Sequence, residues 1–122
     1  MRHQTKKHTL GKAQDQRKAL LRSLATELFT HGEIKTTMAR AKALQPYAEN
    51  VITMAKKGDL NSRRLAGKYI YDKEIGQLID TTTGEVFDAP QEGKKLAKQT
   101  VLRKLFSVIG VKYSSRQGGY TR

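Results

Sequence analysis

The chain has 122 residues, with 24 Lys and Arg against 11 Asp and Glu and a formal net charge of +13. Its length fits one domain, the absence of Cys excludes disulfides and thiolate metal sites, and no apolar run reaches the roughly 18 residues of a membrane span. Because so basic a chain repels itself when compact, a polyanion is the expected partner, and nucleic acid is the first candidate. We expect no membrane partner and no small-molecule substrate.

The charge is distributed unevenly along the sequence. Residues 1–14 are basic and contain no acid, which predicts an extended phosphate-binding arm ahead of a single compact domain over 15–122. Residues 72–92 reverse the sign, with six carboxylates against Lys73 alone. We therefore expect an acidic loop insertion over 80–93 that faces away from the nucleic acid.

The first helix is predicted over residues 16–31. Asp15 is its expected N-cap, and Gly32 stands where a helix-ending glycine belongs. A short strand or extended connector is expected over 33–37.

Thr37 is predicted to cap a second helix that ends near Lys57, with Gly58 beyond it. Pro46 falls inside this helix and predicts a kink, or two helices that meet there. The predicted buried face consists of Met38, Ala41, Leu44, Ala48, Val51, Ile52 and Ala55.

The second half of the chain is predicted to begin with two more helices. Asp59 is expected to cap a third helix that runs to Tyr71, with an inward face of Leu65, Ala66, Tyr69 and Ile70. Asp72 is expected to cap a brief fourth helix that ends near Leu78.

A loop or weak hairpin is expected over 80–93, with a turn at Thr82-Thr83-Gly84-Glu85. A last helix is predicted over 94–109 and ends at Gly110, and a loop over 114–119 leads to a possible strand start at Tyr120. The expected fold class is α+β: a mostly helical single domain packed around a small sheet.

Two groups of basic residues are the strongest candidate phosphate contacts. Arg63 and Arg64 are predicted to open the third helix, where guanidinium groups and backbone N–H groups can share one phosphate. Lys35 and Lys42 flank the start of the second helix, where cations oppose the helix dipole unless an anion compensates. The alternative for Arg63 and Arg64 is a pair of solvated arginines.

The C-terminal segment adds Tyr113 and Tyr120 on either side of Arg116, and these rings are candidates for stacking on bases or for core packing. The complete set of predicted nucleic-acid-binding residues is Arg2, His3, Lys6, Lys7, His8, Lys12, Arg17, Lys18, Arg22, Lys35, Thr36, Thr37, Arg40, Lys42, Arg63, Arg64, Lys112, Arg116, Gly118, Gly119, Tyr120 and Arg122.

No motif for catalysis, metal binding or a cofactor occurs in the sequence. Two other classes of function remain open from the residues alone. One is a small basic nuclease that uses His31 and Glu33, and the other is a DNA-compacting protein, because charge does not separate DNA from RNA.

Several motifs in order along the chain resemble the bacterial family of large-subunit ribosomal protein seventeen. They are Met1-Arg2-His3, Asp15-Gln16-Arg17-Lys18-Ala19-Leu20-Leu21-Arg22, Ile34-Lys35-Thr36-Thr37, Arg40-Ala41-Lys42, Ile52-Thr53, Ala55-Lys56-Lys57-Gly58-Asp59-Leu60, Ser62-Arg63-Arg64, Leu105-Phe106 and Arg116-Gln117-Gly118-Gly119-Tyr120-Thr121-Arg122. The resemblance implies a non-enzymatic, cytoplasmic component of the large ribosomal subunit with a compact α/β domain. It also implies binding to the large ribosomal RNA and to neighbouring ribosomal proteins, on the solvent side near the polypeptide exit.

The sequence departs from this family in two places. Members of the family continue past the final Arg122 into a further strand and a loop, so we expect an incomplete sheet or a shortened chain. The acidic segment 80–93 is longer than is usual in the family, and the resemblance therefore implies no role for it.

Overall fold

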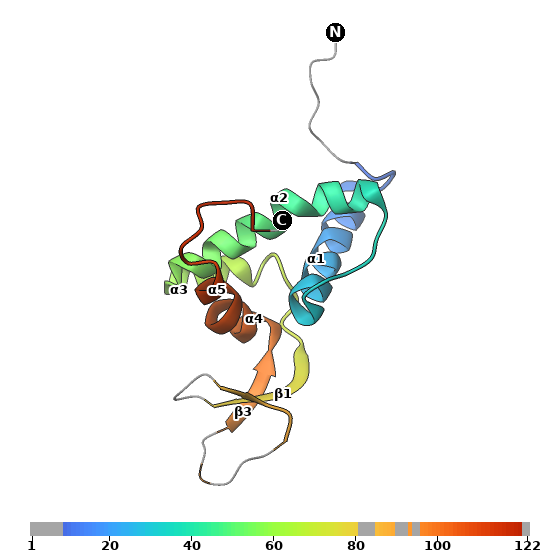
Figure 1. Ribbon diagram of the computed structural model, residues 1–122. Helices are drawn as coiled ribbons and strands as arrows, with labels where there is room; N and C mark the ends of the chain where they lie inside the picture. Colours follow the sequence, from blue (N-terminus) through green and yellow to red (C-terminus); the bar gives the residue numbers. More distant parts are fainter. Residues whose placement is uncertain (1–8, 81–84, 90–92, 94–95, 121–122) are drawn as a thin grey trace.

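The computed structural model describes residues 9–80, 85–89, 93 and 96–120. Its helices and strands form a helical body with a small antiparallel sheet at one end (Figure 1). The elements in chain order are α1 (Gln14–His31), α2 (Met38–Lys57), α3 (Leu60–Ala66), β1 (Glu74–Asp80), β2 (Val86–Phe87), β3 (Leu96–Thr100), α4 (Val101–Lys104), η1 (Leu105–Ile109) and α5 (Gly110–Lys112). The α+β fold class is confirmed.

The ends of α1 follow local signals in part. Gly32 ends the helix in a left-handed conformation with φ of 85°, as predicted, and residues 33–37 form an irregular connector rather than a strand. The predicted cap is wrong, because Ala13 is the N-cap and Asp15 lies in the first turn. A carboxylate there still interacts favourably with the helix dipole.

Helix α2 begins and ends as predicted. The Thr37 hydroxyl accepts a hydrogen bond from the backbone N–H of Arg40 at 3.3 Å, and Gly58 ends the helix with φ of 69°. Pro46 lies inside one helix, so the alternative of two helices is wrong. Met38 and Ala41 are exposed, contrary to the predicted buried face, because they line an open groove beside α1.

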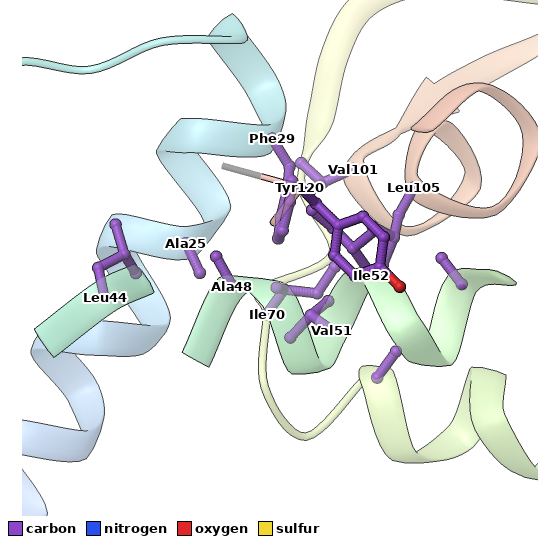
Figure 2. Packing of buried hydrophobic residues seen from close by; sticks show 12 residues of the cluster. Ala25, Phe29, Leu44, Ala48, Val51, Ile52, Ile70, Val101, Leu105 and Tyr120 are labelled. Carbon is purple, nitrogen blue, oxygen red and sulfur yellow. The ribbon is translucent and has the colours of Figure 1, made fainter. Parts of the chain in front are cut away.

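The core lies where α1, α2 and the helix that starts at α4 meet (Figure 2). Its members come from distant parts of the sequence, so burying them fixes the relative positions of these helices. They are Ala25, Phe29, Leu44, Ala48, Val51, Ile52, Ala55, Ala66, Ile70, Val101, Leu105 and Tyr120.

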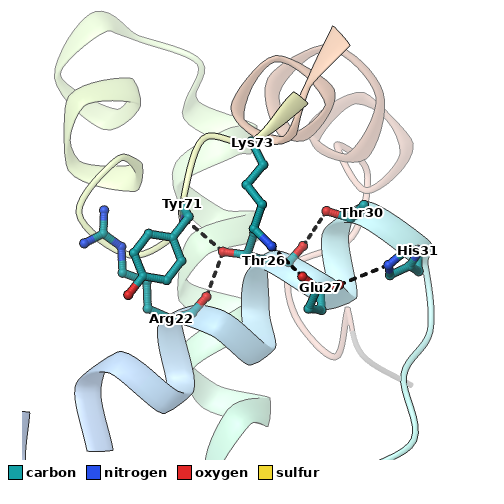
Figure 3. Close-up of polar contacts among 7 residues, drawn as sticks. All are labelled: Arg22, Thr26, Glu27, Thr30, His31, Tyr71 and Lys73. Carbon is teal, nitrogen blue, oxygen red and sulfur yellow. Dashed lines mark hydrogen bonds and ion pairs between the residues drawn. The ribbon is translucent and has the colours of Figure 1, made fainter. Parts of the chain in front are cut away.

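The predicted third helix is too long, because α3 ends at Ala66. Beyond it a few backbone hydrogen bonds continue as turns, including that from the Ile70 N–H to the Ala66 carbonyl at 3.2 Å, and side chains of α1 and α2 also hold the chain. The Tyr47 hydroxyl donates to the Tyr69 carbonyl at 2.6 Å. The backbone N–H of Tyr71 donates to the Thr26 hydroxyl at 2.8 Å, as Figure 3 shows.

The predicted fourth helix is wrong, since the segment forms strand β1. Gly76 has φ of 87° and lies where the pairing with β3 shifts register between Glu74 and Leu78, so it marks a bulge that no helix accommodates. Asp72 does act as a cap, but across the fold: its carboxylate accepts the backbone N–H of Leu102 in α4 at 3.2 Å.

The weak hairpin is confirmed by the pairing of β1 with β2, in which Leu78 faces Phe87. The first three residues of its predicted turn, 82–84, lie outside the described part of the chain. The strand order is β2-β1-β3, and β3 replaces the first part of the predicted helix over 94–109. This non-local pairing with β1 outweighs the helical propensity of residues 96–100.

The helix that follows β3 runs through a π-helical turn at Leu105–Ile109 and continues to Lys112. The prediction that Gly110 ends the helix is therefore wrong. It is buried against α2, and a Cβ atom at this position would lie 2.8 Å from the Ala55 carbonyl oxygen. Tyr120 lies in a turn rather than a strand.

We expect Gly110→Ala to lower the free energy of unfolding by about 1–3 kcal/mol, because the added methyl group meets backbone that cannot rotate away. Intrinsic helix propensity alone predicts the opposite sign, by about 1 kcal/mol. The matched control is Gly67→Ala, because a Cβ atom at this position would lie 3.4 Å from its nearest neighbour, the Arg64 carbonyl oxygen, which is an ordinary contact distance. Urea unfolding of both variants tests the close approach, and equal stabilities would contradict it.

Candidate nucleic-acid interface

The predicted binding residues do not all have the same freedom to contact a ligand. Six of them lie outside the described part of the chain: Arg2, His3, Lys6, Lys7, His8 and Arg122. Of the others, the side chains of Lys12, Lys18, Lys35, Lys42, Arg63, Arg64 and Lys112 are exposed, and Arg17 and Arg40 are half-buried.

Arg22 is engaged by the fold itself. Its Nη2 donates to the carbonyls of Gly67 at 2.9 Å and Ile70 at 3.3 Å, and its guanidinium lies 4.3 Å from the centre of the Tyr71 ring (Figure 3). The side chain therefore joins α1 to the segment after α3. Arg22 is one of the predicted nucleic-acid-binding residues, and the structure gives its guanidinium internal partners instead.

A second group of cations braces the C-terminal segment. Lys56 donates to the Arg116 carbonyl and, at 2.9 Å, to the Tyr120 hydroxyl, while Arg116 Nη2 donates to the Gly119 carbonyl at 2.8 Å. The Lys56 ammonium and the Thr53 hydroxyl hold the pKa of Tyr120 below its usual value.

Tyr120 is only 5% exposed and packs edge-to-face against Tyr113, with ring centres 5.7 Å apart. Its ring is part of the core, and this geometry leaves no open face for a base to stack on. Gly119 has φ of 66°, a turn conformation that glycine adopts without strain, and Gly118 is exposed.

The start of α2 presents cations to solvent without a neighbouring acid in its first turn. Thr37 caps the helix, the side chains of Lys35, Thr36 and Lys42 are exposed, and Arg40 is half-buried. Residues 34–48 contain no Asp or Glu. This stretch keeps the electrostatic misfit that the sequence predicted and is open to an anionic ligand.

The placement predicted for Arg63 and Arg64 is wrong. Helix α3 has seven residues, and both arginines lie in its last turn rather than at its start. Asp59 caps the start through Ser62, whose hydrogen bonds lower the pKa of the Asp59 carboxyl. The guanidinium of Arg63 lies 5.6 Å from the centre of the Phe106 ring, and Arg64 is exposed.

The nuclease hypothesis required His31 to work with Glu33. Instead, His31 Nε2 lies 3.0 Å from Oε2 of Glu27, one turn earlier on α1 (Figure 3). Glu27 also accepts a 2.6 Å hydrogen bond from Lys73. Within the described ranges, no group of three or more His, Asp and Glu side chains is placed to hold a metal ion.

Sequence reasoning missed two features of this surface. Lys104 is partly buried, donates to the Thr30 carbonyl at the end of α1 at 2.9 Å, and has its pKa lowered by desolvation. Met38 and Ala41 were assigned to the core, but they open onto a groove between α1 and α2. The polar residues in the stretch from Lys35 to Arg40 were the sequence signal that could have indicated this exposure.

Comparisons with known proteins identify the family. A family model described as ribosomal protein L17 matches residues 20–122. The chain belongs to the ribosomal protein L17 family. It is 48% identical over 113 residues to the large ribosomal subunit protein bL17 of Staphylococcus carnosus, and 43% identical over 113 residues to that of Lactiplantibacillus plantarum. Each match covers 93% of this chain and 80% of the relative.

Membership of this family assigns the chain a structural role in the large ribosomal subunit, in the cytoplasm, and not an enzymatic one. The identification fits the excess of exposed cations and the acid-free stretch at the start of α2. In the part of the chain that the structure describes, no helix is long and apolar enough to cross a bilayer.

The ion pairs around Glu27 predict a pH dependence of stability. Lys73, and after it His31, hold the pKa of Glu27 below its usual value. A carboxyl with a lowered native pKa stabilises the fold above its unfolded pKa, and this contribution is lost as the pH falls through the native pKa. We expect Glu27→Gln to lower the free energy of unfolding by a few tenths of a kcal/mol at pH 7, because the Glu27 and Lys73 side chains are both well exposed. The loss should be smaller below about pH 4.3.

Urea unfolding at a series of pH values measures this difference. Repeating the series in a Lys73→Met background is the control, since the pH dependence should then largely disappear. If the free energies of unfolding of the unmodified chain and of Glu27→Gln differ by the same amount from pH 7 to pH 3, the stabilising role of the Glu27 carboxylate is contradicted.

Proposed function

We propose that this chain binds large-subunit ribosomal RNA chiefly through phosphate contacts of its exposed Lys and Arg side chains. The observation that carries the proposal is the start of α2, where exposed Lys35 and Lys42 stand in a stretch without a single carboxylate. Lys and Arg contacts to phosphates release counterions and supply most of the sequence-independent affinity of such proteins.

The cations fall into two groups under this proposal. The direct contacts are the exposed or half-buried ones, namely Lys12, Arg17, Lys18, Lys35, Arg40, Lys42, Arg63, Arg64 and Lys112, together with Arg2, His3, Lys6, Lys7, His8 and Arg122 outside the described residues. Arg22 and Arg116 act indirectly, because they hold the backbone that presents the others.

The proposal divides the chain into an RNA-binding arm over residues 1–14 and one compact domain over 15–122. The resemblance to the family further supports a position on the solvent side of the subunit near the polypeptide exit, beside other ribosomal proteins. The acidic end of the molecule, around β1 and β2, is expected to face away from RNA, because its carboxylates would repel phosphates.

The DNA-compacting alternative differs in ligand preference. A protein that recognises charge alone binds duplex DNA and ribosomal RNA with similar affinity at equal salt, whereas a ribosomal protein should prefer the folded RNA. Competition of the full chain between large-subunit ribosomal RNA and duplex DNA therefore separates the two functions, and no preference for RNA would contradict the proposal.

Deletion of residues 2–14 is expected to weaken RNA binding and to flatten its salt dependence while the domain stays folded. The segment carries four Lys and Arg, and each lost phosphate contact should reduce the slope of log affinity against log salt by about 0.7–0.9. Binding measured across a salt series gives the slope, and circular dichroism checks the helices. An unchanged slope would count against the arm.

A further inference from the structure

A groove runs between α1 and the first half of α2. Its walls are apolar and come from α1, the 33–37 connector and α2: Leu28, Ile34, Met38, Ala41, Leu44 and Ala48. Its volume is about 470 Å³, which lies within the range of small-molecule sites. Met38 is 72% exposed here, a large apolar side chain that the fold leaves uncovered.

The remaining residues of the groove lining are polar or basic. Thr36, Lys42 and Gln45 complete its lining, and Lys35 follows Ile34 directly on the connector. No Asp or Glu occurs between residues 34 and 48. Apolar walls that include Lys42 and lie next in sequence to the exposed Lys35 complement a ligand that has a flat apolar part and flanking negative charges.

We propose that this groove receives one unstacked nucleobase of the large-subunit ribosomal RNA, while Lys35 and Lys42 bind the phosphates on either side of it. This inference rests on the proposed function and names the part of the RNA that this surface takes. Proteins read single-stranded RNA by enclosing splayed-out bases and by hydrogen bonding to their edges. The exposed Thr36 hydroxyl and Gln45 amide supply donors and acceptors for such an edge.

A segment of a neighbouring protein is the competing occupant. It could fill the apolar part of the groove with an aliphatic side chain, but it would need acidic residues beside that side chain to match Lys35 and Lys42. Every nucleotide within an RNA chain has a phosphate on either side, so the positions of Lys35 and Lys42 favour RNA as the occupant.

Filling the groove tests the proposal. Ala41→Trp adds an indole at the groove wall, and Ala39→Trp places the same side chain two residues away, on nearly the opposite face of α2. Both alanines are exposed, so neither change disturbs the core. We expect Ala41→Trp to bind large-subunit ribosomal RNA about tenfold more weakly than Ala39→Trp, as is typical when one base contact is lost.

Because the phosphate contacts remain, the salt slope should be nearly the same in both variants. Equal affinity of the two variants, or tighter binding by Ala41→Trp, would overturn the groove assignment while leaving the proposed function intact. Failure of the unmodified chain to bind the RNA in a salt-dependent way would instead contradict the proposed function.

A photo-crosslink distinguishes the two occupants in the assembled particle. A benzophenone amino acid replaces Met38 in one variant and Val111, which is 66% exposed, in the control. After irradiation of purified large subunits, we expect position 38 to cross-link to a single RNA nucleotide that position 111 does not reach. A cross-link from position 38 to a protein, or an RNA pattern identical to that of position 111, would overturn the proposal.

Discussion

The buried hydroxyl of Thr26 organises the centre of the molecule. Completely shielded from solvent, it donates to the Arg22 carbonyl on its own helix and accepts the backbone N–H of Tyr71. Arg22 reinforces the link through the carbonyls of Gly67 and Ile70. Because buried polar groups must find partners, these bonds fix the course of the chain as it leaves α3.

The sheet and the last helix both depend on that course. Directly after the clamped segment, the Asp72 carboxylate caps α4 at Leu102 and the Lys73 carbonyl accepts the N–H of Val101. These contacts join the end of β3 to the start of β1 and seat Val101 in the core. An error in the path of residues 67–73 would therefore displace both the sheet and the helix behind it.

The same contacts divide the basic residues by role. Arg22, Lys56, Lys104 and Arg116 bond to backbone carbonyls and stabilise the fold, while cations such as Lys18, Lys35 and Lys42 extend into solvent. A protein with a small hydrophobic core thus uses part of its positive charge as internal support. The remaining charge extends into solvent, where it is free to meet a polyanion.

Local sequence signals predicted several of the helix ends and missed the non-local contacts. Thr37, Asp59, Gly32 and Gly58 were assigned correctly, because a cap involves residues three or four apart. The β1–β3 pairing, the reach of Asp72 to Leu102 and the internal use of Arg22 were missed. Each joins residues at least 16 positions apart, and no short-range pattern encodes such a partner.

The division of the cations can be tested with two single substitutions on α1. Arg22→Ala and Lys18→Ala each remove one positive charge, from an internally bonded and an exposed side chain respectively. Urea unfolding and the salt slope of ribosomal RNA binding should be measured on both. The account predicts that Arg22→Ala lowers the free energy of unfolding by about 1–3 kcal/mol with little change in slope. It predicts that Lys18→Ala keeps its stability within about 0.5 kcal/mol and reduces the slope by about 0.7–0.9. The opposite result would contradict the division of the cations. In that case Arg22→Ala would be stable with a reduced salt slope, and Lys18→Ala would be destabilised with an unchanged salt slope.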